Sequence, residues 1–153
     1  GMIAQTVAYD FPERTRSLIS IMSTTWAPHL PPPGREQEQG ISDMNESSAE
    51  QAENLEKIGF YPRALPNQVT AILSAGDRTT QVGTIEAPTL VLHGADDELL
   101  SVEHGKHTAE VISGAKLKIY KNMGHSLPDH VIPEMVDDIL GHLSTKPKLA
   151  SSE

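Results

Sequence analysis

A strand–helix–strand pattern in the C-terminal half constrains the fold of this chain more than any other feature. The apolar run PTLVLHG at 88–94 is typical of a buried strand, and AKLKIY at 115–120 alternates as a half-exposed strand does. Between them a helix is predicted from Ser101 to about Ile112. Two parallel strands joined by a helix form a βαβ unit, so the predicted class is α/β.

Further predicted elements surround this unit. The apolar run SLISIMS at 17–23 contains two isoleucines and is typical of a strand covered on both faces. A capping box, Ser47-x-x-Glu50, predicts a helix that ends near Gly59. Apolar residues at helical spacing predict three more helices, over 2–9, 66–75 and 130–143. We expect the chain, 1–153, to be a single α/β domain of about three parallel strands with flanking helices.

The first and last of these helices each carry an apolar stripe of the kind that faces a core. The stripe of the first helix consists of Met2, Ile3, Ala4, Val7 and Ala8. The stripe of the last helix consists of Ile132, Met135, Val136, Ile139, Leu140 and Leu143.

The net charge of −9 argues against two classes of partner. It repels nucleic acid phosphates and anionic lipid surfaces, and no cluster of Lys or Arg reverses it locally. No apolar run reaches the ~18 residues of a membrane span, and the N-terminus lacks the pattern of a signal peptide. Because the cysteine count is 0, a disulfide framework and a thiol nucleophile are excluded. We expect no nucleic acid, no membrane, no metal and no cofactor, and a cytoplasmic location by default.

Polar residues that follow two of the predicted strands form the candidate site. In an open parallel sheet, ligands bind beyond the carboxyl ends of the strands. Asp96 and Asp97 follow the strand 88–94, and His125 follows the strand 115–120. A carboxylate and a histidine at neighbouring strand ends can meet as a base and the group that orients it. The alternative is that both residues cap secondary structure.

Two other groups of polar residues have weaker support. His104 and His107 lie three apart on a predicted helix and would form half of a metal site, but no second pair of ligands accompanies them. We therefore favour a plain surface helix. Ser23, Thr24 and Thr25 end the first strand, where a substitute nucleophile could lie. They lack a strained elbow, so we expect an ordinary hydrogen-bonded strand end.

The two strand-end segments resemble the C-terminal triad segments of the α/β-hydrolase family. PTLVLHGADDELL followed by KLKIYKNMGHSLP contains the family's H-G-x-x-D and G-H motifs in order. The resemblance implies that Asp97 is the acid and His125 the histidine of a catalytic triad, and that Asp96 is a solvated neighbour. Glu98 and Ser101 stand where the family often has proline, which is a mild departure.

The resemblance extends through nearly the whole chain. MIAQTVAYDFPERTRSLISIMSTT resembles the stretch that follows the nucleophile elbow in esterase-like members, and LPPP and NQVTAILSAGDRT resemble the entry and the last helix of a lid. The segments SIMSTT, HGKH and MGHxLP are similar to those of anthracycline methyl esterases. The resemblance implies a shortened, lid-like insert over 26–85. The polar tail 145–153 is expected to be flexible.

The family's nucleophile motif, G-x-S-x-G, does not occur in these residues. We interpret the chain as the C-terminal part of an α/β-hydrolase that retains the acid and the histidine, lacks the serine and is inactive alone. The alternative is a carboxylic-ester-type hydrolase whose serine half comes from another chain. In the intact family the strand 17–23 pairs with the nucleophile strand, so we expect an uncovered edge and a homo-oligomer formed through it. A separate serine-bearing chain is the alternative partner.

Overall fold

The computed structural model describes residues 1–34, 57, 59 and 64–144. The chain divides into two compact units, Gly34–Gly76 and the remainder on either side of it. The smaller unit contains helix α4 (Ala64–Ser74), which lies where the sequence predicts a helix. Of the helix predicted from the Ser47 capping box, only Lys57, which is helical, and Gly59, which lies in a turn, are described; the rest of it and the predicted tail 145–153 lie outside the described residues.

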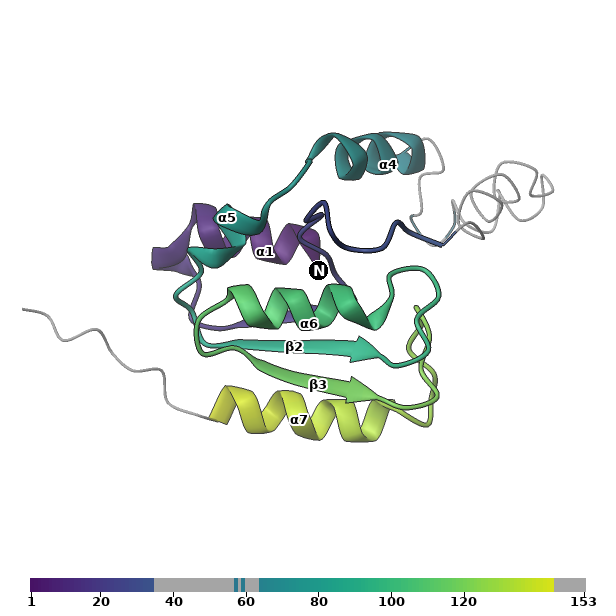
Figure 1. The fold of residues 1–153 in the computed structure, drawn as a ribbon. Coiled ribbons are helices and arrows are strands. Elements are labelled where there is room, and N and C mark those ends of the chain that lie inside the picture. The colour runs from purple at the N-terminus through teal and green to yellow at the C-terminus, as the bar shows by residue number, and fades with distance from the viewer. Residues whose placement is uncertain (35–56, 58, 60–63, 145–153) are drawn as a thin grey trace, which may run out of the picture. The chain divides into compact units, whose positions relative to one another are not determined.

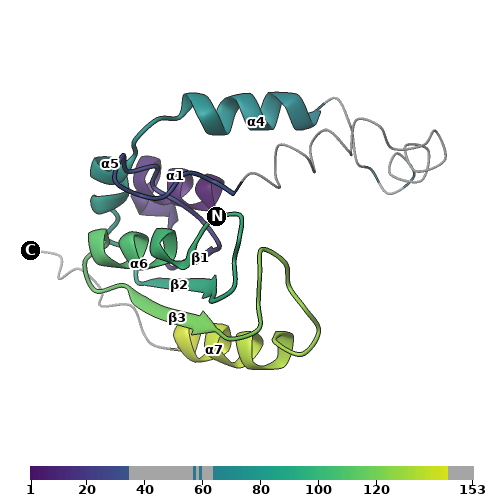
Figure 2. The ribbon, with the colours of Figure 1, turned by 45° about the vertical axis from the view of Figure 1, so that its right-hand side comes forward.

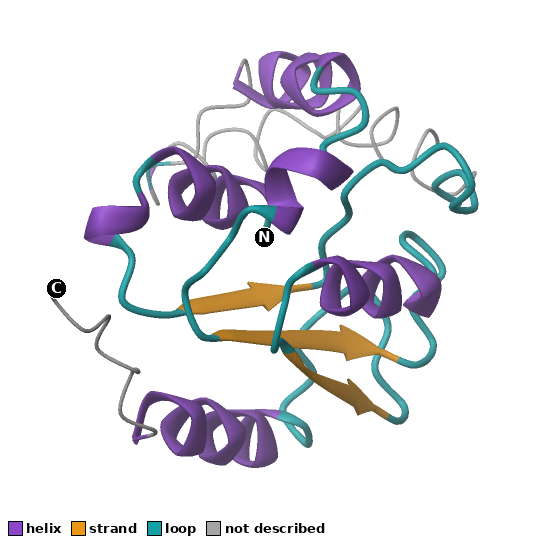
Figure 3. Cartoon of the chain, turned by 60° about the vertical axis from the view of Figure 1, so that its left-hand side comes forward, coloured by secondary structure: helices purple, strands orange, loops and turns teal. Residues whose placement is uncertain are grey.

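The larger unit is built on a parallel sheet of three strands, as predicted (Figure 3). The strands are β1 (Leu18–Ile21), β2 (Thr89–Gly94) and β3 (Lys116–Tyr120), and they lie in the order of their appearance. In register, Ile21 of β1 faces Leu92 of β2. Every residue of β2 is buried because this central strand has a neighbour on each side and helices on both faces, which explains its continuous apolar run.

Helices cover both faces of the sheet (Figure 1). Helices α1 (Met2–Asp10), α5 (Thr79–Gly83) and α6 (Val102–Val111) lie on one face, and α7 (Ile132–Ser144) lies on the other. The first face is packed around Ala8, Leu18, Val82, Ile85 and Ile112. The second face is packed around Leu90, Leu92, Tyr120, Met123, Val131 and Met135. No helix among the described residues is both long and apolar enough to cross a membrane.

Strand β1 is shorter than the predicted 17–23 and lies at one edge of the sheet (Figure 2). It ends at Ile21 because Met22 has a φ of 43°, in the left-handed region that interrupts a strand. The N–H groups of Leu18 and Met22 donate to the carbonyls of Pro88 and Leu92, on the β2 side. Since alternate residues of a strand face opposite neighbours, the N–H groups of Ile19 and Ile21 face the edge.

Two short helices were not predicted. Helix α5 has five residues, and a 3-10 helix spans Pro12–Arg14 directly after α1. Neither is long enough to give a helical periodicity in the sequence.

The apolar stripes of α1 and α7 are buried only in part, which corrects the sequence expectation. On α1, Ala8 is buried, whereas Ile3 is 82% exposed and the polar Gln5 is fully buried. On α7, Met135 is buried. The exposed apolar residues lie four or three apart along α7 and comprise Ile132, Val136, Leu140 and Leu143. The stripe of α7 is therefore wide enough to have one buried edge and one exposed edge.

Candidate active site

Asp97 is held in the loop between β2 and α6 by backbone hydrogen bonds. Its Oδ1 accepts from the N–H groups of Leu99 at 3.0 Å and Leu100 at 2.9 Å. An aspartate that binds backbone N–H groups two and three residues ahead closes a tight turn. The carboxylate is fully buried, so its second oxygen has a fixed direction.

His125 meets that second oxygen. Its Nδ1 lies 2.8 Å from Oδ2 of Asp97, and about a third of its side chain, 35%, is exposed. Because a carboxylate accepts, Nδ1–H donates to Asp97, and the other ring nitrogen, Nε2, is then the basic one. Nε2 has no hydrogen-bond partner among the residues that the structure describes. A buried acid that orients an exposed histidine is the arrangement of a general base and its orienting group.

The two loops that carry the pair are joined directly to each other. The N–H of Asp96 donates to the carbonyl of Met123 at 3.0 Å. A Cβ at Gly94 would overlap the carbonyl oxygen of Met123 and lie 2.7 Å from that of Gly124, so only glycine permits this approach. Asn122 has a φ of 56°, a conformation that asparagine tolerates better than most residues.

The residues at the end of β1 do not bind His125. Thr24 and Thr25 are buried, and their hydroxyls lie 2.7 Å and 2.9 Å from the Nδ1 atoms of His104 and His107. The Ser23 hydroxyl is buried without a hydrogen-bond partner in the described part of the chain. The expected hydrogen-bonded strand end is therefore present at the two threonines but not at Ser23.

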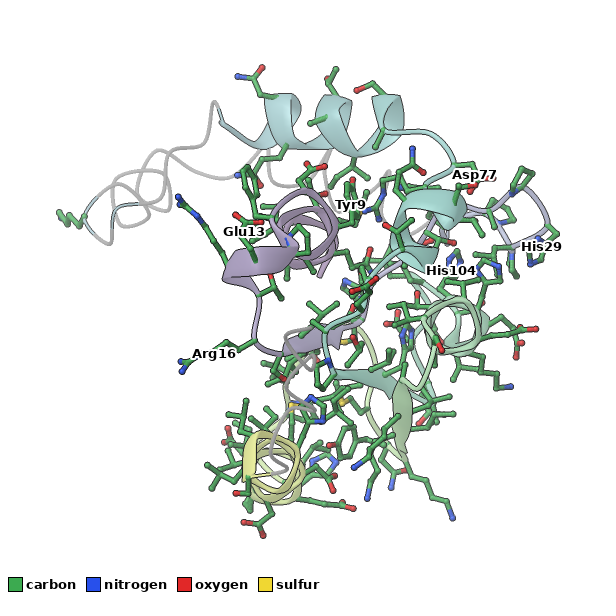
Figure 4. All side chains as sticks on the ribbon, turned by 90° about the vertical axis from the view of Figure 1, so that its left-hand side faces the viewer. Tyr9, Glu13, Arg16, His29, Asp77 and His104 are labelled. Atoms are coloured by element: carbon green, nitrogen blue, oxygen red, sulfur yellow. The ribbon has the colours of Figure 1, made fainter. Side chains whose placement is uncertain are left out.

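His104 and His107 are not on a plain surface helix, which corrects the sequence expectation. His104 is fully buried, and its Nε2 donates to the carbonyl of Pro31 at 3.0 Å. Burial lowers the pKa of His104 below its ordinary value, and burial together with His29 lowers that of His107. The rings of His29 and His107 are 4.7 Å apart, on the side of the molecule where Figure 4 shows His29 and Asp77. No cluster suited to a metal ion occurs within the described ranges.

A buried polar network beside β1 was missed by sequence reasoning. Arg78 is buried and donates through Nη2 to Gln5 Oε1 at 2.9 Å and to the carbonyl of Thr24. Gln5 in turn donates to Ser20 at 3.0 Å, and the Arg78 N–H donates to the carbonyl of Thr25 at 2.7 Å. The one available signal was the polar Gln5 between apolar residues of a helix.

Comparison with known proteins identifies the group to which these features belong. The family model described as serine aminopeptidase, S33, matches residues 2–129. The bifunctional esterase/perhydrolase DCH of Acinetobacter calcoaceticus is 34% identical over 71 residues, which are 46% of this chain and 26% of that protein. A non-heme haloperoxidase of Rhodococcus erythropolis is 33% identical over 55 residues, 35% of this chain and 20% of that protein.

A solved structure shares the fold over most of this chain. A putative lipase from Acinetobacter baumannii matches with a TM-score of 0.67 at 21% identity, over 94% of this chain and 58% of its own. The matches therefore span less than a third of each of the two curated relatives and somewhat more than half of the lipase.

Proposed function

The chain belongs to the serine aminopeptidase S33 family of α/β-hydrolases, and on that premise we propose that it supplies the acid and the base of a Ser–His–Asp hydrolase site. Asp97 is the proposed acid and His125 the proposed base. The observation that carries the proposal is the 2.8 Å contact between Asp97 Oδ2 and His125 Nδ1, while Nε2 has no hydrogen-bond partner among the described residues. In such a site Nε2 takes the proton of the serine hydroxyl as the serine attacks, and then gives it to the leaving group.

The proposed nucleophile lies outside these 153 residues, either on the same polypeptide or on another chain. This is supported by the absence of G-x-S-x-G from the sequence and by the absence of a described hydroxyl bound to His125 Nε2. Without the serine and its oxyanion donors, the barrier to acyl transfer loses its largest sources of stabilisation. The 153-residue chain alone is therefore proposed to be inactive.

Carboxylic esters are the proposed substrate class. One relative is named as an esterase/perhydrolase, and acyl transfer from an ester needs only the nucleophile, the base and the oxyanion donors. The alternative is a non-catalytic interaction module in which the Asp97–His125 pair persists without a substrate.

A fluorophosphonate probe and a short-chain ester assay test the proposal. The chain alone should neither be labelled nor hydrolyse the ester faster than its His125→Ala variant. Co-expression with the product of an adjacent reading frame that contains G-x-S-x-G should give labelling and turnover, both lost in Asp97→Ala and His125→Ala. Turnover by the chain alone that His125→Ala abolishes would show a nucleophile within it, with Ser23 the first residue to test. Normal folding of both partners without turnover would favour the non-catalytic alternative.

Self-association through the β1 edge is the proposed assembly, with a second copy of the chain as the partner. The edge-facing N–H groups of Ile19 and Ile21 support it, because unpaired strand edges pair readily and a two-fold antiparallel contact satisfies both copies. Exposed apolar side chains also support it. They lie on the two helices that cover opposite faces of the sheet and include Ile3 and Val7 on α1 and Leu140 on α7. Binding of a serine-bearing chain in place of the second copy is the competing outcome.

A further inference from the structure

His93 is a buried polar residue next to the acid–base pair. It is the penultimate residue of β2, and its side chain has no exposed surface. Leu90 and Leu92 belong to the core on the α7 face, so by alternation His93 points to the face covered by α6. A polar ring in such a position lowers stability unless hydrogen bonds compensate for its lost hydration. Its partners therefore indicate what the ring does.

The partners of His93 belong to the loop that carries the acid. Nε2 of His93 lies 2.8 Å from the carbonyl oxygen of Leu100 and 3.4 Å from Oδ2 of Asp97. Both neighbours are acceptors, so Nε2 carries the proton and donates to Leu100. The N–H of the same Leu100 donates to Oδ1 of Asp97. His93 thus binds Leu100, which in turn binds Asp97. The ring N–H of His93 also faces Oδ2 of Asp97, the oxygen that binds His125.

Gly105 of α6 allows the His93 ring to take this position. A Cβ built at Gly105 would lie 2.6 Å from Nδ1 and 2.8 Å from Cγ of His93, closer than such atoms approach. The ring therefore packs directly against the backbone of α6. Nδ1 of His93 is buried without a hydrogen-bond partner in the described residues, which leaves Nε2 as the nitrogen through which the ring acts.

We propose that His93 is a positioning residue, seated by Gly105, that fixes the loop 95–100 so that Oδ2 of Asp97 meets Nδ1 of His125. The inference rests on the proposed function, because it concerns the same acid and base. It adds two residues, His93 and Gly105, that act through Asp97.

Proton NMR of the whole chain tests this inference without any serine or substrate. The Nδ1–H of His125, bound to a carboxylate, should give a low-field resonance that disappears in Asp97→Ala. In His93→Leu this proton should exchange with solvent at least about tenfold faster, since a weakened hydrogen bond opens more often. His93→Gln, whose amide nitrogen reaches the place of Nε2, should restore slow exchange. Gly105→Ala, which displaces the ring, should also accelerate exchange.

His142→Leu is the matched control. His142 is another buried histidine, but it binds Ser17 and the carbonyl of Pro88 at the opposite ends of the strands. Its loss should lower stability and leave the exchange of the His125 proton within about twofold of the wild-type rate. If His93→Leu does not fold, Gly105→Ala and His93→Gln provide the comparison.

The outcomes separate this inference from the proposed function. A wild-type resonance that His93→Leu and Gly105→Ala leave unchanged would overturn the role of His93 while the acid–base pair stands. Equal acceleration in His93→Leu and His142→Leu would mean a general loss of stability and would also overturn it. A missing resonance in the folded wild-type chain would contradict the Asp97–His125 contact and with it both proposals. If the NMR results are as expected but co-expression with the G-x-S-x-G partner gives no ester turnover, the proposed function alone would be overturned.

Discussion

The carboxyl ends of β2 and β3 and the outer edge of β1 belong to the same sheet but differ in how their polar groups are satisfied. At the strand ends, Asp97 has partners for both oxygens, and the two loops are bonded to each other. At the edge, the N–H groups of Ile19 and Ile21 face away from β2, their partner strand. At the strand ends the polar groups of Asp97 and His125 satisfy each other, whereas the outward N–H groups of β1 have no neighbouring strand within the described residues.

The difference follows from how far apart in the chain the interacting groups are. Asp97 and His125 are carried by consecutive strands of one βαβ unit, so one short stretch of chain forms the whole contact. The edge of β1 has no such neighbour within the described residues. The contact between Asp97 and His125 is therefore ordered in detail beside a strand edge whose outward N–H groups are not paired with β2.

The largest effect is expected from closing the space that joins the two loops. Gly94→Ala would place a Cβ against the carbonyls of Met123 and Gly124, and backbone atoms cannot move aside as a flexible side chain can. We expect a loss of about 3 kcal/mol in the free energy of unfolding by urea denaturation. Gly141→Ala is the control, because a Cβ there meets open space in α7 and should stabilise the helix by up to about 1 kcal/mol. Equal stability of Gly94→Ala and the wild type would contradict the tight contact between the loops.

At the edge, proline substitution should act on assembly. Ile19→Pro or Ile21→Pro removes an outward-facing N–H, so light scattering at micromolar concentration should show monomer where the wild type is a dimer. The dissociation constant of the dimer should rise at least about tenfold. Ile19→Val, which keeps the N–H, should remain dimeric. A monodisperse, stable wild-type monomer would exclude self-association and would favour a different partner for the edge.

The stability of the folded chain is expected to depend on pH because of His104, which is buried on helix α6. Burial, more than any other effect, lowers the pKa of His104, while its hydrogen bond to Pro31 and the charge of Asp97 oppose the shift. The unfolded chain therefore takes up a proton more readily than the folded chain does. Stability should be full above about pH 6.5 and should decline as the pH falls from there towards the lowered pKa.

Urea midpoints measured above and below that pH test this expectation. His104→Gln keeps a donor for the Pro31 carbonyl and cannot titrate, so its midpoint should vary less with pH than that of the wild type. Some variation should remain, because the pKa of His107 is lowered as well. An unchanged pH profile in His104→Gln would show that the decline has another source.

The smallest effect is expected on the exposed side of α7. Leu140 is 56% exposed, so Leu140→Gln should change the free energy of unfolding of the isolated chain by no more than about 0.5 kcal/mol. Met135→Gln, five residues earlier on α7 but buried, should cost about 2 kcal/mol because it loses core packing and buries an amide. If Leu140→Gln also lowers dimer affinity, the exposed stripe belongs to the proposed interface.

The elements predicted correctly are those whose hydrophobic periodicity and end residues lie within one short stretch of sequence. The strand β2, the helix α6 and the strand β3 lie within one or two residues of their predicted bounds, because each has an uninterrupted period and clear end signals. Asp97 and His125 come together as predicted because they follow adjacent parallel strands. Neighbouring positions at strand ends can be inferred from topology alone.

The parts that sequence reasoning missed depend on contacts between distant residues. Arg78 binds Gln5, and His104 binds Thr24, across 73 and 80 positions in the chain. Nothing local distinguishes a buried histidine from one on the surface of a helix. The sequence identified His93 only as part of the H-G-x-x-D motif. Its contact with Leu100 depends on the folded conformation of the loop after β2, which the motif does not specify.

The link between Arg78 and Thr25 has a consequence for how this protein can change over evolution. The N–H of Arg78 donates to the carbonyl of Thr25, and its guanidinium donates to that of Thr24, so the two ends of the intervening segment 26–77 are held together by hydrogen bonds. The entropic cost of closing a flexible loop grows only with the logarithm of its length, by about 0.6 kcal/mol for each doubling. Segments of different length and composition between these two points should therefore be exchangeable with little effect on the contact between Asp97 and His125.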